Sequence, residues 1–116
     1  MVAPGWVPRR GEIIHLDDSG GAGHEQTGDR PYLVLTPQGY NDKLSLVVCV
    51  PITTAIKGSA FEHPLSGRQK PCVALTHQIT TADWRARKAF SRGMSDKVEF
   101  DHVLAKIASL LGMVYR

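Results

Sequence analysis

The sequence predicts a small β-barrel or coiled sheet capped by a C-terminal helix. Short runs of apolar and β-branched residues alternate with turns rich in Gly, Pro, Asn and Asp, which is typical of small all-β architectures. Only the C-terminal segment has apolar residues at helical spacing. The chain has 116 residues, of which 42% are hydrophobic and 22% charged, so we expect one folded domain over residues 1–116.

The β-rich runs predict strands, and the segments between them predict loops and turns. Residues 18–30 form a long polar loop with many glycines, and residues 38–43 and 66–71 carry turn residues. The nearly continuous apolar run at 44–50 indicates burial on both faces, and we expect Pro51 to end or bulge that strand. The expected strands are residues 11–17, 32–36, 44–50, 61–65, 72–80 and 84–90.

The expected helix covers residues 95–111. Ser95 is the expected N-cap, Glu99 suits the positive end of the helix dipole, and Gly112 is the expected stop. One apolar stripe, expected to pack on the core, comprises Phe100, Val103, Leu104, Ile107, Leu110 and Leu111.

Composition excludes several classes of protein. No apolar run approaches the ~20 residues that span a bilayer, and the first residues lack the pattern of a signal peptide, so we expect a cytoplasmic protein without membrane contact. Cys49 and Cys72 lie in apolar runs without metal-ligand spacing, which predicts buried, reduced thiols. The net charge of +3 and pI near 9.1 favour a polyanionic partner only weakly.

The most informative segment is GHEQTGDRP at residues 23–31, a glycine-rich loop crowded with ionisable side chains. Pro31 restricts the backbone of Arg30 to an extended form, which holds a guanidinium at the start of a strand. A fixed guanidinium can donate two parallel hydrogen bonds to one phosphate. The alternative is a solvated ion pair between Arg30 and Asp29 or Glu25.

Known catalytic motifs are missing from the sequence. It has no P-loop, no Gly-x-Ser-x-Gly elbow and no Cys/His metal cluster, so no metal or cofactor is expected. RNA suits such a protein because its 2′-OH is itself a nucleophile beside each phosphate. The protein must then orient that hydroxyl, neutralise the phosphate and move protons.

Three further side chains fit that chemistry. Thr53, at the end of a buried strand, could donate to a phosphate oxygen, although a strand-end turn explains it as well. Glu25 and His24 could each take the 2′-OH proton or protonate the leaving 5′-oxygen. The alternative for both is an ordinary solvated loop residue.

Residues 84–88 suggest a second nucleic-acid contact. If this segment is extended, Arg85 and Arg87 share one face beside Trp84, which suits phosphate contacts and base stacking. An edge strand protected by charge is the equal alternative. His77 and Gln78 lie in the middle of an expected strand with opposite orientations, and either could be a core polar group.

Taken together, these segments resemble the MazF/PemK/Kid family of bacterial toxin components, most closely its MazF branch. The resemblance runs from residue 11 to residue 112. It is carried by GHEQTGDRP at 23–31, VCVPITT at 48–54, Lys57 with Gly58, VAL at 73–75 with Gln78, WRAR at 84–87, and the helix through residues 105–107.

The resemblance implies an SH3-like β-barrel with a C-terminal helix, a homodimer, and a metal-independent endoribonuclease specific for short sequences in single-stranded RNA. Cleavage leaves a 2′,3′-cyclic phosphate and a 5′-OH. The family's catalytic pair matches Arg30 and Thr53, and its loop glutamate matches Glu25. The partner is an antitoxin of the MazE type, whose acidic tail covers the RNA groove. The expected RNA contacts are His24, Gln26, Lys57, Gln78, Arg85 and Arg87.

The sequence departs from the family pattern at two places. Asp18, followed by Ser19 and Gly20, stands where relatives often carry an aromatic residue that touches RNA bases. His77 replaces an acidic residue before Gln78. We therefore expect different recognised bases but the same cleavage chemistry.

Two other functions fit a barrel of this kind. A gyrase-poisoning toxin of the CcdB type would need no Arg/Thr pair, but the tail GMVYR at 112–116 lacks the Trp-Gly-Ile ending of that group. A barrel that binds a partner or RNA without cutting is the third possibility.

Overall fold

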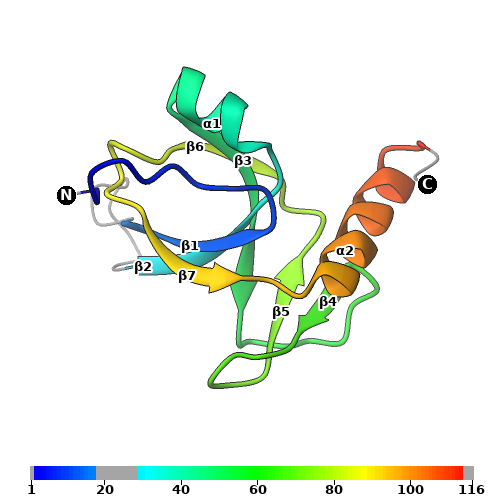
Figure 1. Ribbon diagram of the computed structural model, residues 1–116. Coiled ribbons are helices and arrows are strands. Elements are labelled where there is room, and N and C mark those ends of the chain that lie inside the picture. The colour runs from blue at the N-terminus through cyan, green and yellow to red at the C-terminus, as the bar shows by residue number, and fades with distance from the viewer. Residues whose placement is uncertain (1, 18–28, 114–116) are drawn as a thin grey trace, which may run out of the picture.

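The computed structural model describes residues 2–17 and 29–113. The described chain forms seven strands and two helices (Figure 1). In order they are β1 (Glu12–Asp17), β2 (Asp29–Val34), α1 (Gln38–Leu44), β3 (Leu46–Thr53), β4 (Glu62–Leu65), β5 (Cys72–Leu75), β6 (Thr80–Asp83), β7 (Phe90–Met94) and α2 (Lys97–Leu110).

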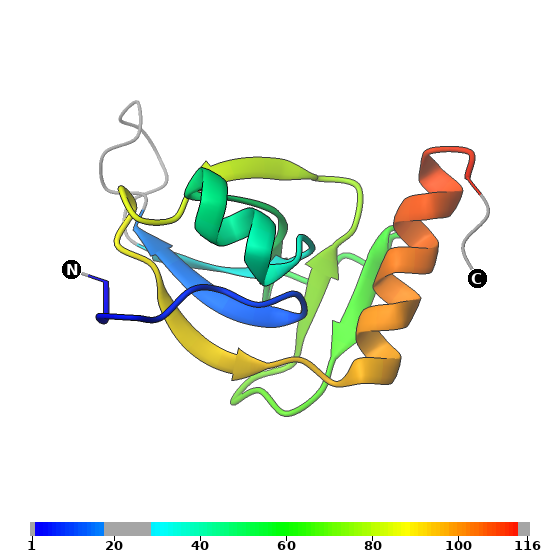
Figure 2. The ribbon, with the colours of Figure 1, turned by 45° about the horizontal axis from the view of Figure 1, so that its top comes forward.

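The strands form one antiparallel sheet that curls into a half-barrel, in the order β4-β5-β3-β2-β1-β7. β3 organises the sheet because β6 pairs with its first half and β5 with its last residues. Figures 1 and 2 show α1 beside β3 and β6, and α2 alongside β4 on another side of the sheet. The predicted β architecture with a C-terminal helix is confirmed.

Two hydrophobic clusters lie on opposite faces of β1, because alternate residues of a strand point in opposite directions. Ile13 packs in the first cluster with Phe100 and Val103 of α2. Ile14 packs in the second cluster with Trp84. Since both faces are covered, β1 is buried along nearly its whole length.

Helix α2 begins one residue later than expected. Asp96, not Ser95, is the N-cap, and its side chain accepts a hydrogen bond of 3.0 Å from the Glu99 N–H. Ser95 instead donates its hydroxyl to the Gly11 carbonyl, which ties the helix start to the residue before β1. Gly112 follows the helix with φ of +75°, as expected of a stop.

The apolar stripe of α2 is shorter than expected. Phe100, Val103 and Ile107 are buried and Leu104 packs against them, but Leu110 and Leu111 are 43% and 58% exposed. The prediction for these two leucines is wrong because the buried positions of the helix end at residue 108.

Residues 38–43, expected to form a turn, belong to helix α1. Asn41 explains why this short segment is helical. Its buried side-chain amide donates to the Pro8 and Thr36 carbonyls, and its backbone carbonyl accepts from the Trp84 indole N–H at 2.8 Å. Long-range contacts override the turn propensity of the sequence here.

Two of the expected strands are also wrong. Residues 72–80 divide into β5 and β6 because the chain turns at Thr76, whose N–H and hydroxyl both donate to the Phe61 carbonyl. His77 and Gln78 therefore lie exposed in a turn, not inside a strand. Residues 84–89 form turns around buried Trp84, and the strand begins only at Phe90.

Pro51 lies within β3 and does not end it. It is opposite Tyr32 of β2, while on the other side β6 pairs only as far as Cys49 and β5 begins at Ile52. Proline has no N–H to donate to a neighbouring strand, and it is tolerated here because it lies between the part of β3 that pairs with β6 and the part that pairs with β5. As a result β3 continues to Thr53.

Candidate active site

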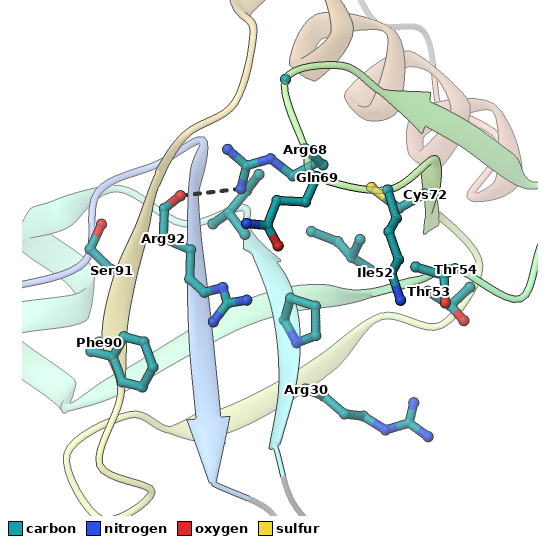
Figure 3. Close-up of a pocket in the computed structure, with 14 residues that line it drawn as sticks. Arg30, Ile52, Thr53, Thr54, Arg68, Gln69, Cys72, Phe90, Ser91 and Arg92 are labelled. Carbon is teal, nitrogen blue, oxygen red and sulfur yellow. Dashed lines mark hydrogen bonds between the residues drawn. The ribbon is translucent and has the colours of Figure 1, made fainter.

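A cavity of about 690 Å³ opens where β2, β3 and β7 face the β4–β5 hairpin (Figure 3). Its lining combines apolar side chains with cationic and hydroxyl-bearing ones. The lining residues are Ile13, Arg30, Pro31, Ile52, Thr53, Thr54, Gly67, Arg68, Gln69, Lys70, Cys72, Phe90, Ser91 and Arg92.

Arg30 and Thr53 line this cavity together. β2 and β3 pair with Tyr32 opposite Pro51, and the same register continued by two residues brings Arg30 opposite Thr53. Figure 3 shows both side chains at the same end of the cavity. The structure therefore brings both residues to one cavity from neighbouring strands, and their catalytic role stays a prediction.

The Thr53 hydroxyl also has a local structural contact. Its oxygen accepts a hydrogen bond of 3.0 Å from the Ala55 N–H, as in a strand-end turn. A hydroxyl that accepts one bond still has its proton to donate. The turn therefore orients the side chain and leaves it a donor for an anion.

Tyr32 of β2 interacts with two arginines, Arg30 and Arg87. Burial raises the pKa of the Tyr32 phenol, and the Arg30 charge opposes that rise. Arg87 lies over the Tyr32 ring at 5.8 Å from its centroid, and its Nε donates to the Asp17 carbonyl. Burial lowers the pKa of Arg87, while Asp17 opposes the shift.

Arg85 and Arg87 do not share one face of a strand, because residues 84–89 are not extended. Arg85 forms an ion pair of 3.1 Å with Asp42, contacts the Ser45 hydroxyl and stacks 4.2 Å from the Trp84 ring centroid. These contacts fasten the turn to α1. Neither arginine lines the cavity.

Lys57 and Gln78 also lie away from the cavity lining, in exposed segments. The backbone of the loop at Lys57 is nevertheless held in place: the N–H groups of Lys57 and Gly58 donate to the Glu62 carboxylate at 3.0 and 2.9 Å. These bonds, that of Lys57 first, lower the pKa of Glu62. His24, Glu25 and Gln26 lie outside the described residues.

Both cysteines are free and buried, as predicted. Burial raises the pKa of Cys49 to about 12. Burial also raises the pKa of Cys72, although that residue lines the cavity. Each thiol is therefore protonated at neutral pH, which makes it a poor nucleophile.

Within residues 2–17 and 29–113, no three His, Cys, Asp or Glu side chains gather closely enough to hold a metal ion. Neither helix in that part of the chain is long and apolar enough to cross a membrane.

Residues 9–111 match the family described as PemK-like, MazF-like toxins of type II toxin–antitoxin systems. The chain belongs to this family.

Individual relatives agree with that membership. The chain is 42% identical over 107 residues to the endoribonuclease toxin MazF of Escherichia coli strain K12. The aligned region covers 92% of this chain and 96% of the relative. It is 31% identical to the endoribonuclease PemK of Escherichia coli, with 92% of each chain covered.

Solved structures of the same family superpose closely on the fold. A MazF structure from Deinococcus radiodurans has a TM-score of 0.81 at 37% identity, covering 93% of this chain and 99% of that one. A MazE–MazF complex from the same organism has a TM-score of 0.82 at 33% identity, covering 93% and 98%. The resemblance predicted from the sequence is confirmed.

The sequence did not predict that the β4–β5 hairpin and β7 contribute to this cavity. Arg68, Gln69 and Lys70 come from the β4–β5 hairpin, and Phe90 and Arg92 come from β7. The Arg68 guanidinium donates to the Arg92 carbonyl at 3.1 Å, which joins the two elements (Figure 3). The only signal in the sequence was the basic composition of the expected turn at 66–71.

Proposed function

We propose that this chain, as one mRNA-interferase domain over residues 1–116, is the toxin of a toxin–antitoxin pair and cleaves single-stranded mRNA at specific short sequences without the ribosome. The ribose 2′-OH attacks the adjacent phosphate, which leaves a 2′,3′-cyclic phosphate and a 5′-OH. The observation that carries the proposal is the shared cavity of Arg30 and Thr53, whose lining also includes Arg68, Lys70 and Arg92. That many cations around an open cavity suit a phosphate chain.

The two side chains have separate tasks in the proposed reaction. Arg30 binds the non-bridging oxygens of the scissile phosphate through its planar fork, and it stabilises the extra negative charge of the transition state. Thr53 donates its hydroxyl proton to one of those oxygens in a hydrogen bond. Both groups hold the phosphate so that the neighbouring 2′-OH can attack in line.

Proton transfer falls to the loop before β2. Glu25 positions or deprotonates the 2′-OH, and His24 is the second candidate for that step. RNA that extends beyond the cavity meets the remaining proposed contacts, which are Gln26, Lys57, Gln78, Arg85 and Arg87. The chemistry uses no metal or cofactor.

The proposed partners are a second copy of the chain and an antitoxin of the MazE type. Relatives with 33% and 32% identity were crystallised as MazE–MazF complexes, which supports the antitoxin. Exposed apolar side chains support a protein interface, and they include Ile56, Phe61, Leu110, Leu111 and Met113. An acidic antitoxin segment complements the cationic side chains that line the cavity. Since the substrate is mRNA, the proposed compartment is the cytoplasm.

The decisive test replaces the guanidinium. Arg30→Ala is expected to lower the cleavage rate of a fluorescent RNA in EDTA by at least about 100-fold, because a preorganised donor to the developing charge is lost. Arg9→Ala is the matched control, since it removes the same charge from an exposed side chain outside the cavity. Circular dichroism and sedimentation should report the same fold and assembly for all three proteins.

Full activity of Arg30→Ala would remove this residue from the mechanism. The ends of the wild-type products separate the three candidate functions. A gyrase poison of the CcdB type, or a barrel that only binds, would leave the RNA uncut, whereas the proposed nuclease generates cyclic-phosphate ends.

A further inference from the structure

Phe90, the first residue of β7, forms a stacked aromatic pair with His15 of β1. The two residues are cross-strand neighbours, and their rings stack with centroids 4.4 Å apart and planes 15° apart. His15 lies in turn opposite Pro31 of β2. Cross-strand neighbours project from the same face of a sheet. Pro31, His15 and Phe90 therefore form one row, and its two outer members line the cavity that contains Arg30.

The Phe90 ring is exposed but held in place. It is 48% exposed, whereas the supporting His15 is only 8% exposed. β7 is at the end of the strand order, so among the described elements no further strand covers the outer side of the ring. A large aromatic side chain that is fixed by stacking on one side and open on the other loses little conformational entropy when it binds a flat ligand.

The surroundings of Phe90 are cationic and polar. Ser91 and Arg92 follow it along β7, and both line the cavity. Figure 3 shows Phe90 at the end of the cavity away from Thr53 and Thr54, with the Arg92 side chain extending into the space between. Arg68 is joined to the Arg92 backbone by its hydrogen bond. A platform with cations beside it suits a nucleobase and its phosphate better than an apolar protein surface.

We propose that Phe90 stacks against one base of the RNA and that Arg92 binds a phosphate next to that base. This inference rests on the proposed nuclease function and deepens it by adding a subsite. Because Phe90 and Thr53 lie at opposite ends of the cavity, the stacked base belongs to a nucleotide that flanks the scissile step. Stacking tolerates different bases, so Phe90 contributes affinity and register more than base identity.

The test is a double-mutant cycle between protein and RNA. The probe is a single-stranded RNA that contains a cleavage site, with a 2′-deoxy nucleotide at the cut so that it binds without being cleaved. Fluorescence anisotropy measures its dissociation constant for the wild type and for Phe90→Ala. We expect the alanine variant to bind roughly tenfold more weakly, in line with the loss of one base–aromatic stack.

A series of probes with one abasic position each then locates the base. One abasic position outside the scissile step should weaken wild-type binding by a similar factor but leave binding to Phe90→Ala unchanged. The other positions should weaken both proteins equally. Phe90→Trp should restore affinity, whereas Phe90→Leu, which keeps an apolar side chain in the same place, should not.

Three outcomes overturn the inference. The first is unchanged RNA affinity in Phe90→Ala and Phe90→Leu, and the second is an equal effect of every abasic position in both proteins. The third is a loss of self-association with RNA binding intact, which would assign Phe90 to a protein contact. Should the alanine variant unfold, the comparison of Phe90→Leu with Phe90→Trp decides. Absence of cleavage of all-ribose RNA by the wild type would refute the nuclease function separately, because binding is measured with an uncleavable probe.

Discussion

The hydroxyl of Thr53 has two roles, a structural one in the turn that follows β3 and a proposed catalytic one in the cavity. The bond from the Ala55 N–H fixes the hydroxyl at the end of β3, and the proton remains available to a phosphate oxygen in the cavity. A side chain already held by its own turn loses little freedom when the substrate binds, which favours catalysis.

Substitution of Thr53 separates these two uses. Thr53→Ser keeps the acceptor and the donor, so cleavage should stay within about tenfold of the wild type. Thr53→Val has nearly the same shape but no hydroxyl, and we expect a loss of about 100-fold in kcat. Because the Ala55 bond is also lost, unfolding free energy should fall by about 1 kcal/mol. Single-turnover cleavage measures the rate of the chemical step, and urea unfolding measures the free energy of unfolding. A wild-type cleavage rate in Thr53→Val would exclude a donor role for the Thr53 hydroxyl.

Individual site residues could be predicted where their signal is local. Pro31 restricts Arg30 whatever the rest of the chain does, and Thr53 follows a visibly buried strand. Arg68 and Phe90 carry no such signal. They reach the cavity only because the β4–β5 hairpin approaches β7, and that approach joins residues far apart in sequence.

At the scale of elements, α2 is attached to β4 through polar as well as apolar contacts. Lys106 donates to the Glu62 carbonyl at 2.9 Å, and Glu99 accepts from the Ser66 N–H at the same distance. Between these contacts the rings of His63 and His102 meet edge to face, with centroids 5.4 Å apart. The Nδ1 atom of His63 is buried without a hydrogen-bond partner among the described residues.

This contact predicts a loss of stability in mild acid. Burial, then the charges of Lys106 and His102, lower the pKa of His63 below its usual 6.5, and Glu99 only partly opposes them. The unfolded chain therefore binds a proton at His63 near pH 6.5, while the folded chain binds it only at lower pH. Stability is complete above that pH and declines as the pH falls towards the folded pKa.

Thermal unfolding at several pH values between about 7 and 5 measures this effect. His63→Gln removes the titrating group, so its melting temperature should fall less than that of the wild type over the same interval. His77→Gln is the matched control, because His77 lies exposed in a turn. Equal slopes for His63→Gln and the wild type would mean that the α2–β4 contact does not sense pH.

Two of the elements that the sequence predicted wrongly share one physical cause. Asn41 makes α1 helical through contacts with Pro8 and Trp84, and Thr76 divides one expected strand through its bonds to Phe61. In each case a long-range hydrogen bond overrides the local propensity. α2 was predictable because its apolar residues recur at helical spacing on the face that it buries, and β1 because its short apolar run is buried on both faces.

At the scale of the whole molecule, β3 connects the sheet to the proposed chemistry. It pairs with β2, β5 and β6, and its last residue, Thr53, lines the cavity together with Arg30. Local patterns were enough to predict a β-rich fold with one terminal helix. They contained no information on strand order, so the walls that β7 and the hairpin contribute became evident only from the three-dimensional arrangement.

The central claim is that this cavity lets a ribose attack its own phosphate, and one substitution in the substrate tests it directly. Two RNAs of identical sequence, one of them with a single 2′-deoxy nucleotide at the cut site, are incubated with the wild-type protein in EDTA. Mass spectrometry of the products should show a 2′,3′-cyclic phosphate from the all-ribose RNA only, while the 2′-deoxy RNA binds and stays intact. Cleavage of the 2′-deoxy RNA at the same position would contradict the account.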